Sequence, residues 1–322
     1  MAHKFIISDV GGTNGRFAVA HFKDGASLPD IEHVTVYPCQ DYASLEDMMV
    51  NYLTQLGDQA PRHAQLAIAG PTSERRGIVT NLKWAVDAEK LENKLGLQKV
   101  SLMNDFAALA YATLYLSDDD FYPITPIDLV GETGAPVTIL GPGTGFGVAM
   151  AIPSRGQWRV VSTEGGHMSF SPKTPLEHDL SQHLRRTMDH VSVEHLLSGA
   201  GLERIHRFLV EYGGSGDVTL TAAEISAAAS RGDRPSCVRA VQLFLSILGS
   251  VSGDLALAHG ARGGVVIGGG ILPKIKHHIA QSDLLDRFKM KDQMQPYLET
   301  VPLKIVTSEI SALLGAAMAT FE

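Results

Sequence analysis

The chain has 322 residues, 44% of them hydrophobic, which is longer than one hydrophobic core usually supports, so we expect two domains. Its net charge of -8, without a cluster of Lys and Arg, argues against nucleic acid or an anionic membrane as a partner. Its two cysteines, Cys39 and Cys237, are too few for a disulfide framework or a cysteine-rich metal site, and it shows neither a long apolar run nor a leader pattern, so we expect a cytoplasmic protein.

The first elements are two strands, at residues 5–10 and 16–22, joined by a glycine-rich turn. In a hairpin turn, glycine supplies positive φ and leaves backbone N–H groups open to an anion, which indicates a phosphate-binding loop at Gly11, Gly12, Thr13 and Asn14. No helix follows the glycines, so this is neither a P-loop nor a dinucleotide fingerprint. Asp9 ends the first strand beside the turn, where one carboxylate suits a hydrated Mg²⁺ next to a phosphate.

The rest of the first half alternates between strands and helices, which we expect at 31–37 (strand), 42–56 (helix), 65–69 (strand), 100–103 (strand) and 106–116 (helix). Ser44 is a candidate N-cap of the first helix, and Gly57 ends it. Asn104 and Asp105 lie between the last strand and the last helix, where an ordinary N-cap is one interpretation. The same place also suits a carboxylate that accepts a proton from a substrate hydroxyl, because ligands of α/β folds bind at the carboxyl ends of strands.

A polar, proline-containing segment at 117–130 is the first plausible domain boundary, and the pattern then repeats. The second glycine turn, Gly141 to Gly147, also lies between two strands and shares its Gly-Thr pair, Gly143-Thr144, with the first turn. Two hairpins that simply need glycine would look the same, but the pair indicates one strand-turn-strand unit used twice. The remaining expected elements are strands at 137–140, 148–152, 158–162, 264–267 and 303–307, and helices at 193–198, 202–210, 236–259 and 311–321.

Three further motifs have both a structural and a functional interpretation. Glu164-Gly165-Gly166-His167 follows a strand and is either a surface loop or a place where a carboxylate and an imidazole converge. Glu194 lies in the first turn of an expected helix, where an acidic residue also suits the helix dipole. Gly268, Gly269 and Gly270 allow close packing of a strand on a helix, or else a flat surface for a purine.

These motifs, in this order and spacing, resemble those of bacterial glucokinases, which belong to the hexokinase, actin and Hsp70 group. The resemblance spans nearly the whole chain and is carried by Asp9 to Arg16, Asn104-Asp105-Phe106, Gly141 to Gly147, Glu164 to His167, His190 to Glu194 and Gly268 to Gly270. It implies an α/β fold of two actin-like (ribonuclease H-like) domains that flank a nucleotide and sugar cleft. We place the first domain at 1–115 with 303–322, and the second at 116–302.

The resemblance also implies a role for each site residue. Asp105 is the expected general base, which takes the proton of the glucose 6-hydroxyl as that oxygen attacks the γ-phosphorus of ATP. The expected sugar ligands are Asn104, Asp105, Glu164, His167 and Glu194. The expected nucleotide-binding residues are Asp9, Gly11, Gly12, Thr13, Asn14, Gly143, Thr144, Gly268, Gly269 and Gly270. Mg²⁺ is expected beside Asp9, held through water, and the family implies a homodimer. Structural zinc is not expected.

Other functions fit the sequence less well. A sugar-sensing repressor would need a helix-turn-helix, and a switch ATPase of the actin or chaperone type gives no reason for Asn104, Asp105, Glu164, His167 and Glu194 together. A kinase for another hexose, mannose or fructose, remains the alternative within the same class.

Overall fold

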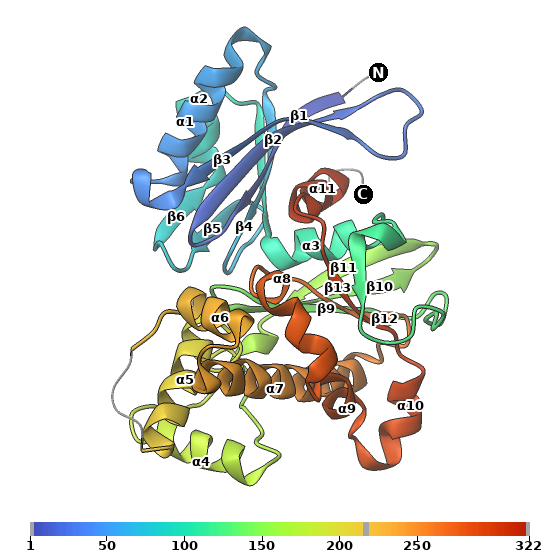
Figure 1. The fold of residues 1–322 in the computed structure, drawn as a ribbon. Helices are drawn as coiled ribbons and strands as arrows, with labels where there is room; N and C mark the ends of the chain where they lie inside the picture. The colour runs from blue at the N-terminus through green and yellow to red at the C-terminus, as the bar shows by residue number, and fades with distance from the viewer. Residues whose placement is uncertain (1–2, 215–218, 320–322) are drawn as a thin grey trace. The chain divides into compact units, whose positions relative to one another are not determined.

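The computed structural model describes residues 3–214 and 219–319, and the chain divides into two compact units. Unit 1 comprises Met1–Asp120 and Ser308–Glu322, and unit 2 comprises Phe121–Thr307. Figure 1 shows both units as α/β structures in which helices cover sheets.

Unit 1 is built on a five-stranded sheet with the order β3-β2-β1-β4-β7. The strands are β1 (His3–Val10), β2 (Asn14–Phe22), β3 (Asp30–Pro38), β4 (His63–Ile68) and β7 (Lys99–Asn104). The first three run antiparallel, whereas β4 and β7 run parallel to β1. A separate hairpin, β5 (Arg76–Val79) with β6 (Trp84–Asp87), follows β4.

Successive side chains of a strand point to opposite faces of a sheet, and this sheet has apolar residues on both faces. Helices therefore cover both faces. Ile6 belongs to a core that also contains residues of two helices, α1 (Leu45–Leu56) and α2 (Ala88–Leu95). Its neighbour Ile7 belongs to a second core with α3 (Asp105–Thr113) and α11 (Ser311–Met318). Figure 1 shows the two pairs of helices on opposite sides of the sheet. Ser44 caps α1 and Gly57 ends it, as the sequence predicts.

Unit 2 repeats the strand order of unit 1 and adds one strand at the edge. Its sheet has the order β11-β10-β9-β12-β13-β8, in which β9, β10 and β11 are antiparallel while β12 and β13 run parallel to β9. The strands are β8 (Phe121–Pro123), β9 (Val137–Pro142), β10 (Phe146–Ser154), β11 (Gln157–Thr163), β12 (Gly264–Ile267) and β13 (Leu303–Val306). The repeat supports the prediction of one strand-turn-strand unit used twice.

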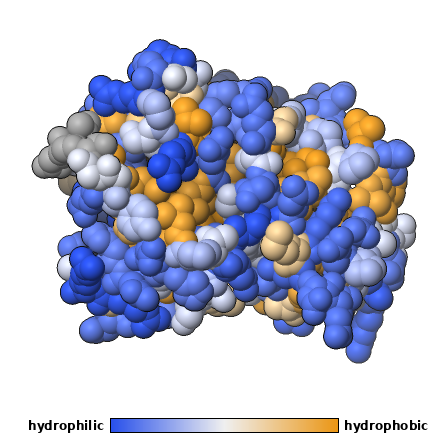
Figure 2. Space-filling model, turned by 60° about the horizontal axis from the view of Figure 1, so that its bottom comes forward, coloured by the Kyte–Doolittle hydropathy of each residue, from blue (hydrophilic) through white to orange (hydrophobic). Residues whose placement is uncertain are grey.

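The helices of unit 2 gather around the longest one, α7, in a single large core. They are α4 (Pro175–Leu184), α5 (Gly199–Tyr212), α6 (Ala222–Arg231), α7 (Pro235–His259), α8 (Leu272–Ile275), α9 (Leu284–Lys289) and α10 (Gln295–Glu299). Within the described residues, α7 is the one helix long and apolar enough to cross a membrane, but 83% of its most apolar stretch is buried inside the structure. That burial is what a core helix requires. The face in Figure 2 is mostly hydrophilic and carries separate hydrophobic patches.

Three expectations need correction. Unit 1 extends to residue 120 and resumes at 308, rather than 115 and 303. The strand at 303–307 does not return to the first unit: β13 pairs with β12 and β8, because a buried parallel strand needs neighbours that satisfy its backbone. The helix predicted at 193–198 is instead a series of turns, and α5 begins at Gly199 with Ser198 as its N-cap.

Candidate functional site

In unit 1, the candidate residues lie at the carboxyl ends of the parallel strands, which are at the same end of the sheet. Val10 of β1 lies opposite Ile68 of β4, and Ile68 lies opposite Asn104 of β7. The carboxyl ends of the three parallel strands are therefore level. Since neighbouring strands are about 4.8 Å apart, the ends of β1 and β7 are separated by roughly 10 Å. The fold thus brings residues 9–14 and 104–105 to the same end of the sheet.

The first glycine turn joins β1 to β2 and is held by backbone bonds. Gly11 N–H donates to the Asn14 carbonyl (3.0 Å), and Cys39 N–H donates to the Thr13 carbonyl (2.8 Å). The predicted positive φ is wrong for Gly11, which lies outside the left-handed region. A Cβ at Gly11 would meet only the Asn14 carbonyl oxygen, at 3.8 Å, so the glycine instead keeps this side of the turn open.

Asp9 carries the carboxylate beside this turn. It pairs across the strands with Arg16, whose Nη1 lies 3.3 Å from Oδ2. The Asp9 side chain is 18% exposed and the Arg16 side chain 40%. Burial raises the pKa of Asp9, and the attraction of Arg16 opposes that rise. A half-buried carboxylate of this kind fits a hydrated Mg²⁺, which uses only one or two protein carboxylates and keeps several waters.

Asn104 and Asp105 start α3, and the capping interpretation is confirmed. The Asn104 Oδ1 accepts from Phe106 N–H (2.9 Å) and Ala107 N–H (3.2 Å), and its Nδ2 donates to the Gly70 carbonyl (3.3 Å). Asp105 Oδ1 accepts from Phe106 N–H at 3.0 Å. Gly70 has a φ of +145°, which favours glycine. Capping does not replace the functional interpretation, because it fixes both side chains at the strand end.

In unit 2, the second glycine turn is joined to the start of α5. Gly143 N–H donates to the Gly145 carbonyl (2.8 Å), and Gly199 N–H donates to the Gly143 carbonyl (2.9 Å). Neither Gly143 nor Gly145 lies in the left-handed region of φ. A Cβ at Gly143 would meet no atom within 4 Å, and Thr144 is exposed, so this turn is open at its tip.

The loop at Gly268 to Gly270 packs against this turn. A Cβ at Gly141 would collide with the Gly268 carbonyl, and one at Gly269 would collide with the Pro142 carbonyl. Gly269 also has a φ of +91°. Gly269 is therefore closely packed, but against the end of β9 rather than between a strand and a helix as the structural interpretation had it. At Gly270 a Cβ would meet nothing within 4 Å, so this end of the loop is open.

The candidate sugar residues of unit 2 come from two segments that bond to each other. Glu194 N–H donates to the Gly166 carbonyl and Val193 N–H to the Met168 carbonyl, each at 2.9 Å. The Glu164 and His167 side chains are 68% and 62% exposed, with Oε2 and Nε2 3.9 Å apart. The two segments that carry Glu164, His167 and Glu194 therefore lie side by side, and a shared sugar-binding role for the three residues stays a prediction.

Two contacts in unit 2 escaped the sequence analysis. A ring nitrogen of His190 lies 3.0 Å from the His167 carbonyl oxygen. Phe146 N–H donates to Glu194 Oε2 at 2.8 Å, which links a candidate sugar residue to the glycine turn. Each contact joins residues more than 20 positions apart in sequence, so no local pattern could have revealed it.

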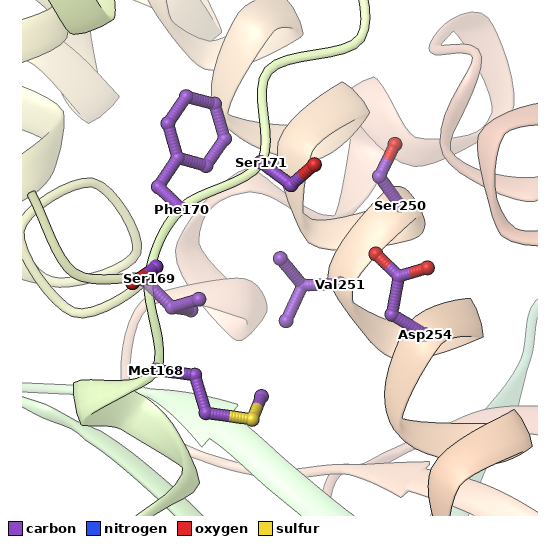
Figure 3. Close-up of a pocket in the computed structure, with 8 residues that line it drawn as sticks. Met168, Ser169, Phe170, Ser171, Ser250, Val251 and Asp254 are labelled. Atoms are coloured by element: carbon purple, nitrogen blue, oxygen red, sulfur yellow. The ribbon is translucent and has the colours of Figure 1, made fainter.

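A cavity of about 130 Å³ in unit 2 is lined by residues next in sequence to two of the candidate sugar residues (Figure 3). Met168, just after His167, and Val193, just before Glu194, line it together with Val251 and Asp254 of α7. None of the predicted site residues lines this cavity.

Among the described residues, one group could hold a metal through His, Cys, Asp or Glu atoms, and it lies elsewhere: His21, Asp30 and Glu32, within 4.8 Å of one another. Their carboxylates already pair with lysines, Asp30 with Lys23 (2.6 Å) and Glu32 with Lys4 (3.4 Å). No pattern in the sequence indicated this group, whose members come from β2 and β3.

The family model and the curated relatives agree on one family. The glucokinase family model matches residues 6–322. The glucokinase of Nitrobacter hamburgensis is 40% identical over 313 residues, covering 97% of this chain and 95% of that protein. A crystal structure of a glucokinase from an Antarctic psychrotroph has a TM-score of 0.83 at 35% identity, covering 98% of both chains. A Streptomyces griseus ROK family glucokinase, in complex with glucose and AMPPNP, shares the fold, with a TM-score of 0.64 at 20% identity over 98% of both chains.

Proposed function

Because the chain belongs to the glucokinase family and is therefore an ATP-dependent sugar kinase, we propose that it transfers the γ-phosphoryl group of ATP to the 6-hydroxyl of glucose. The products are glucose 6-phosphate and ADP. The residue assignment rests on the carboxyl ends of the parallel strands of unit 1, which lie side by side. Asp9 and the glycine turn lie at the end of β1, and Asp105 follows β7 in the same sheet. A catalytic carboxylate and a phosphate turn at one edge are what transfer to a hydroxyl needs.

Asp105 acts as the general base in this proposal. Its carboxylate hydrogen-bonds the 6-hydroxyl and takes its proton as the oxygen attacks the γ-phosphorus, while the bond from that phosphorus to the β-γ bridging oxygen breaks. The start of α3 stabilises the ionised carboxylate, because the N-terminal end of a helix carries a partial positive charge. Its bond from Phe106 N–H holds the side chain in place.

The remaining sugar hydroxyls bond to Asn104, Glu164, His167 and Glu194. Ionised carboxylates are strong acceptors for hydroxyl donors, and the placement of Glu194 beside the loop at 164–167 supports a common role. A site built around specific hydroxyls rejects sugars that lack them, because its acceptors would lose their partners.

The nucleotide is bound by residues of both units. Gly11, Gly12, Thr13 and Asn14 serve the phosphates from unit 1, and Gly143 and Thr144 serve them from unit 2, with Gly268 to Gly270 against the purine. Asp9 would hold Mg²⁺ through water, and the ion would supply positive charge that offsets the charge of the phosphates. Support comes from the open tips of the turn at Gly143 and of the loop at Gly270.

A homodimer in the cytoplasm completes the proposal. The family resemblance supports the dimer, and the acidic charge and few cysteines support the location. Light scattering coupled to size exclusion checks the dimer, and a mass of one chain would contradict it.

An acceptor panel with Mg-ATP tests the function. The rate of ADP formation is measured with glucose, mannose and fructose, and formation of the sugar phosphate is confirmed by mass spectrometry. We expect the highest kcat/KM for glucose. A higher value for mannose or fructose would favour a kinase for another hexose. ADP formed without any sugar phosphate would instead indicate an ATPase.

A further inference from the structure

Glu194 belongs to two parts of the candidate site at once. Its backbone N–H bonds to Gly166, next to His167, and its backbone carbonyl accepts from Ser198 Oγ at 2.8 Å. Its side-chain Oε2 accepts from Phe146 N–H at 2.8 Å, at the point where the second glycine turn enters β10. The Glu194 backbone is thus bonded to the loop at 164–167, and its carboxylate is bonded to the end of the second glycine turn.

Gly145 makes this contact sterically feasible. A Cβ at Gly145 would lie 2.5 Å from Glu194 Oε2 and 3.2 Å from its Cδ, which is closer than such atoms approach in proteins. Any residue other than glycine would therefore displace the carboxylate. Gly145 also holds the turn through its carbonyl, which accepts from Gly143 N–H at 2.8 Å. The Gly145 carbonyl and the Phe146 N–H belong to the same peptide group, so this one group joins the Glu194 carboxylate to the bond that closes the turn.

A carboxylate has two oxygens with about four acceptor positions, and the Phe146 N–H occupies one of them. We propose that Glu194 couples sugar binding to phosphate binding: one part of its carboxylate anchors the second glycine turn while another accepts a sugar hydroxyl. This inference rests on the proposed function. It goes beyond a sugar contact, because it makes Glu194 a positioning residue for a turn that binds the other substrate.

The coupling has a definite sign. A sugar hydroxyl that bonds to the carboxylate fixes the Glu194 rotamer, and the fixed carboxylate holds the turn ready for phosphate. The nucleotide then pays less ordering entropy, so each substrate tightens the binding of the other. We call the ratio of the Kd of one ligand without and with the other ligand the coupling factor. Thermodynamic linkage requires this factor to be the same for glucose and for the nucleotide, and typical factors are about 5- to 150-fold.

Calorimetric titration measures this factor directly. A non-hydrolysable ATP analogue with Mg²⁺ is titrated with and without saturating glucose, and glucose is titrated with and without the analogue. For the wild-type protein we expect each ligand to lower the Kd of the other by about 10-fold. A factor near one in the wild-type protein would overturn the proposal.

Three variants test whether the coupling depends on the contact between Glu194 and the second glycine turn. Glu194→Asp shortens the side chain so that it no longer spans both partners, and Gly145→Ala displaces the carboxylate without changing it. Both should bring the factor close to one. Glu194→Gln keeps an amide oxygen for Phe146 N–H, so it should bind glucose more weakly yet retain most of the factor. A wild-type factor in both Glu194→Asp and Gly145→Ala would overturn the proposal.

Glu164→Gln is the matched control, because Glu164 is a sugar residue of the same surface with its side chain near His167 rather than at the turn. It should weaken glucose binding and leave the factor unchanged at saturating glucose. If it abolishes the factor as Glu194→Asp does, coupling follows from sugar occupancy in general and the role of Glu194 is refuted. Thermal unfolding of each variant confirms folding. Glucose phosphorylation by the wild-type protein separates the two proposals: its absence refutes the proposed function, whereas its presence with unaltered coupling in the variants refutes only this inference.

Discussion

Asp105 begins α3 directly after the cap, Asn104, and its position makes the catalytic assignment testable by one substitution. Asp105→Asn keeps the size of the side chain and an oxygen for Phe106 N–H, but it removes the base. We expect kcat to fall by about 100-fold or more, the usual scale for general-base catalysis, while glucose still binds. Steady-state kinetics and calorimetry check this. Turnover close to that of the wild-type protein would refute the assignment.

Asn104 has a structural and a substrate role, and a second cap separates them. Asn104→Ala removes two cap bonds and the bond to Gly70, which should lower the free energy of unfolding by about 1 kcal/mol or more and raise the KM for glucose. Ser44→Ala removes the cap bond to Asp47 N–H in α1 and should destabilise by a similar amount with no change in KM. Equal changes in KM for both variants would show that the effect is structural only.

For single residues, the sequence predicts the position of a side chain where a local pattern determines it. It does not predict contacts between distant segments. Asn104 and Asp105 lie at a strand-helix junction, which two neighbouring elements define. The bond between Phe146 and Glu194 spans 48 positions and depends on how β10 meets the turns before α5. The positive φ predicted for Gly11 was wrong because a glycine can be required either for a positive φ or for the close approach of another group. The sequence alone does not distinguish these two reasons.

At the scale of elements, the contact of α11 with α3 depends on one glycine. A Cβ at Gly315 would collide with the Ala108 carbonyl, so α11 must shift if any side chain is added. We expect Gly315→Ala to lower the free energy of unfolding by about 1–3 kcal/mol, the cost of overpacking a core, despite the better helix propensity of alanine. Urea denaturation measures it, with the half-buried Ala312→Ser in the same helix as control. An unchanged or raised stability would contradict the contact.

The segment at 193–198 shows why a helix signal can fail. Ser192 resembles an N-cap, and it does accept a bond from His195 N–H at 3.3 Å. The Ser192 N–H in turn donates to the His195 ring at 3.1 Å, which closes one turn on itself. Ser198 then caps a new helix by accepting from Gly201 N–H. Two competing caps six residues apart stop the first turn from propagating, although the pattern after Ser192 predicts a helix there.

At the scale of the molecule, buried histidines predict how stability depends on pH. Burial lowers the pKa of His206, and the charge of Arg234 lowers it further. The unfolded chain therefore binds a proton at a higher pH than the folded protein does. Below about pH 6.5, the usual pKa of histidine, the free energy of unfolding should fall as pH falls. Burial also lowers the pKa of His195, His259 and His278, which adds to the effect.

Urea denaturation between pH 8 and pH 5.5 checks this expectation. His206→Gln should make the dependence less steep, since three other contributing histidines remain, whereas the exposed His63→Gln should leave it as in the wild-type protein. Stability that rises as pH falls from 7 to 5.5 would contradict the burial argument.

The two-unit α/β architecture was predicted well because the glycine turns and strand patterns occur twice. The units have the same strand order from β3 to β7 and from β11 to β13. The boundary near 303 was predicted wrongly, since a short apolar run shows that a strand exists but not which sheet it joins.

The interrupted course of unit 1 has a consequence for synthesis. Its second core, which contains Phe5, Ile7 and Ala18, is closed by Leu313, Leu314 and Met318 of α11. A ribosome makes α11 only after all of unit 2, which takes roughly 10–40 s at bacterial elongation rates. During that interval α3 is the only one of its two helices available to cover this face of the nascent sheet, so the growing chain is a natural client for chaperones that hold exposed apolar surface.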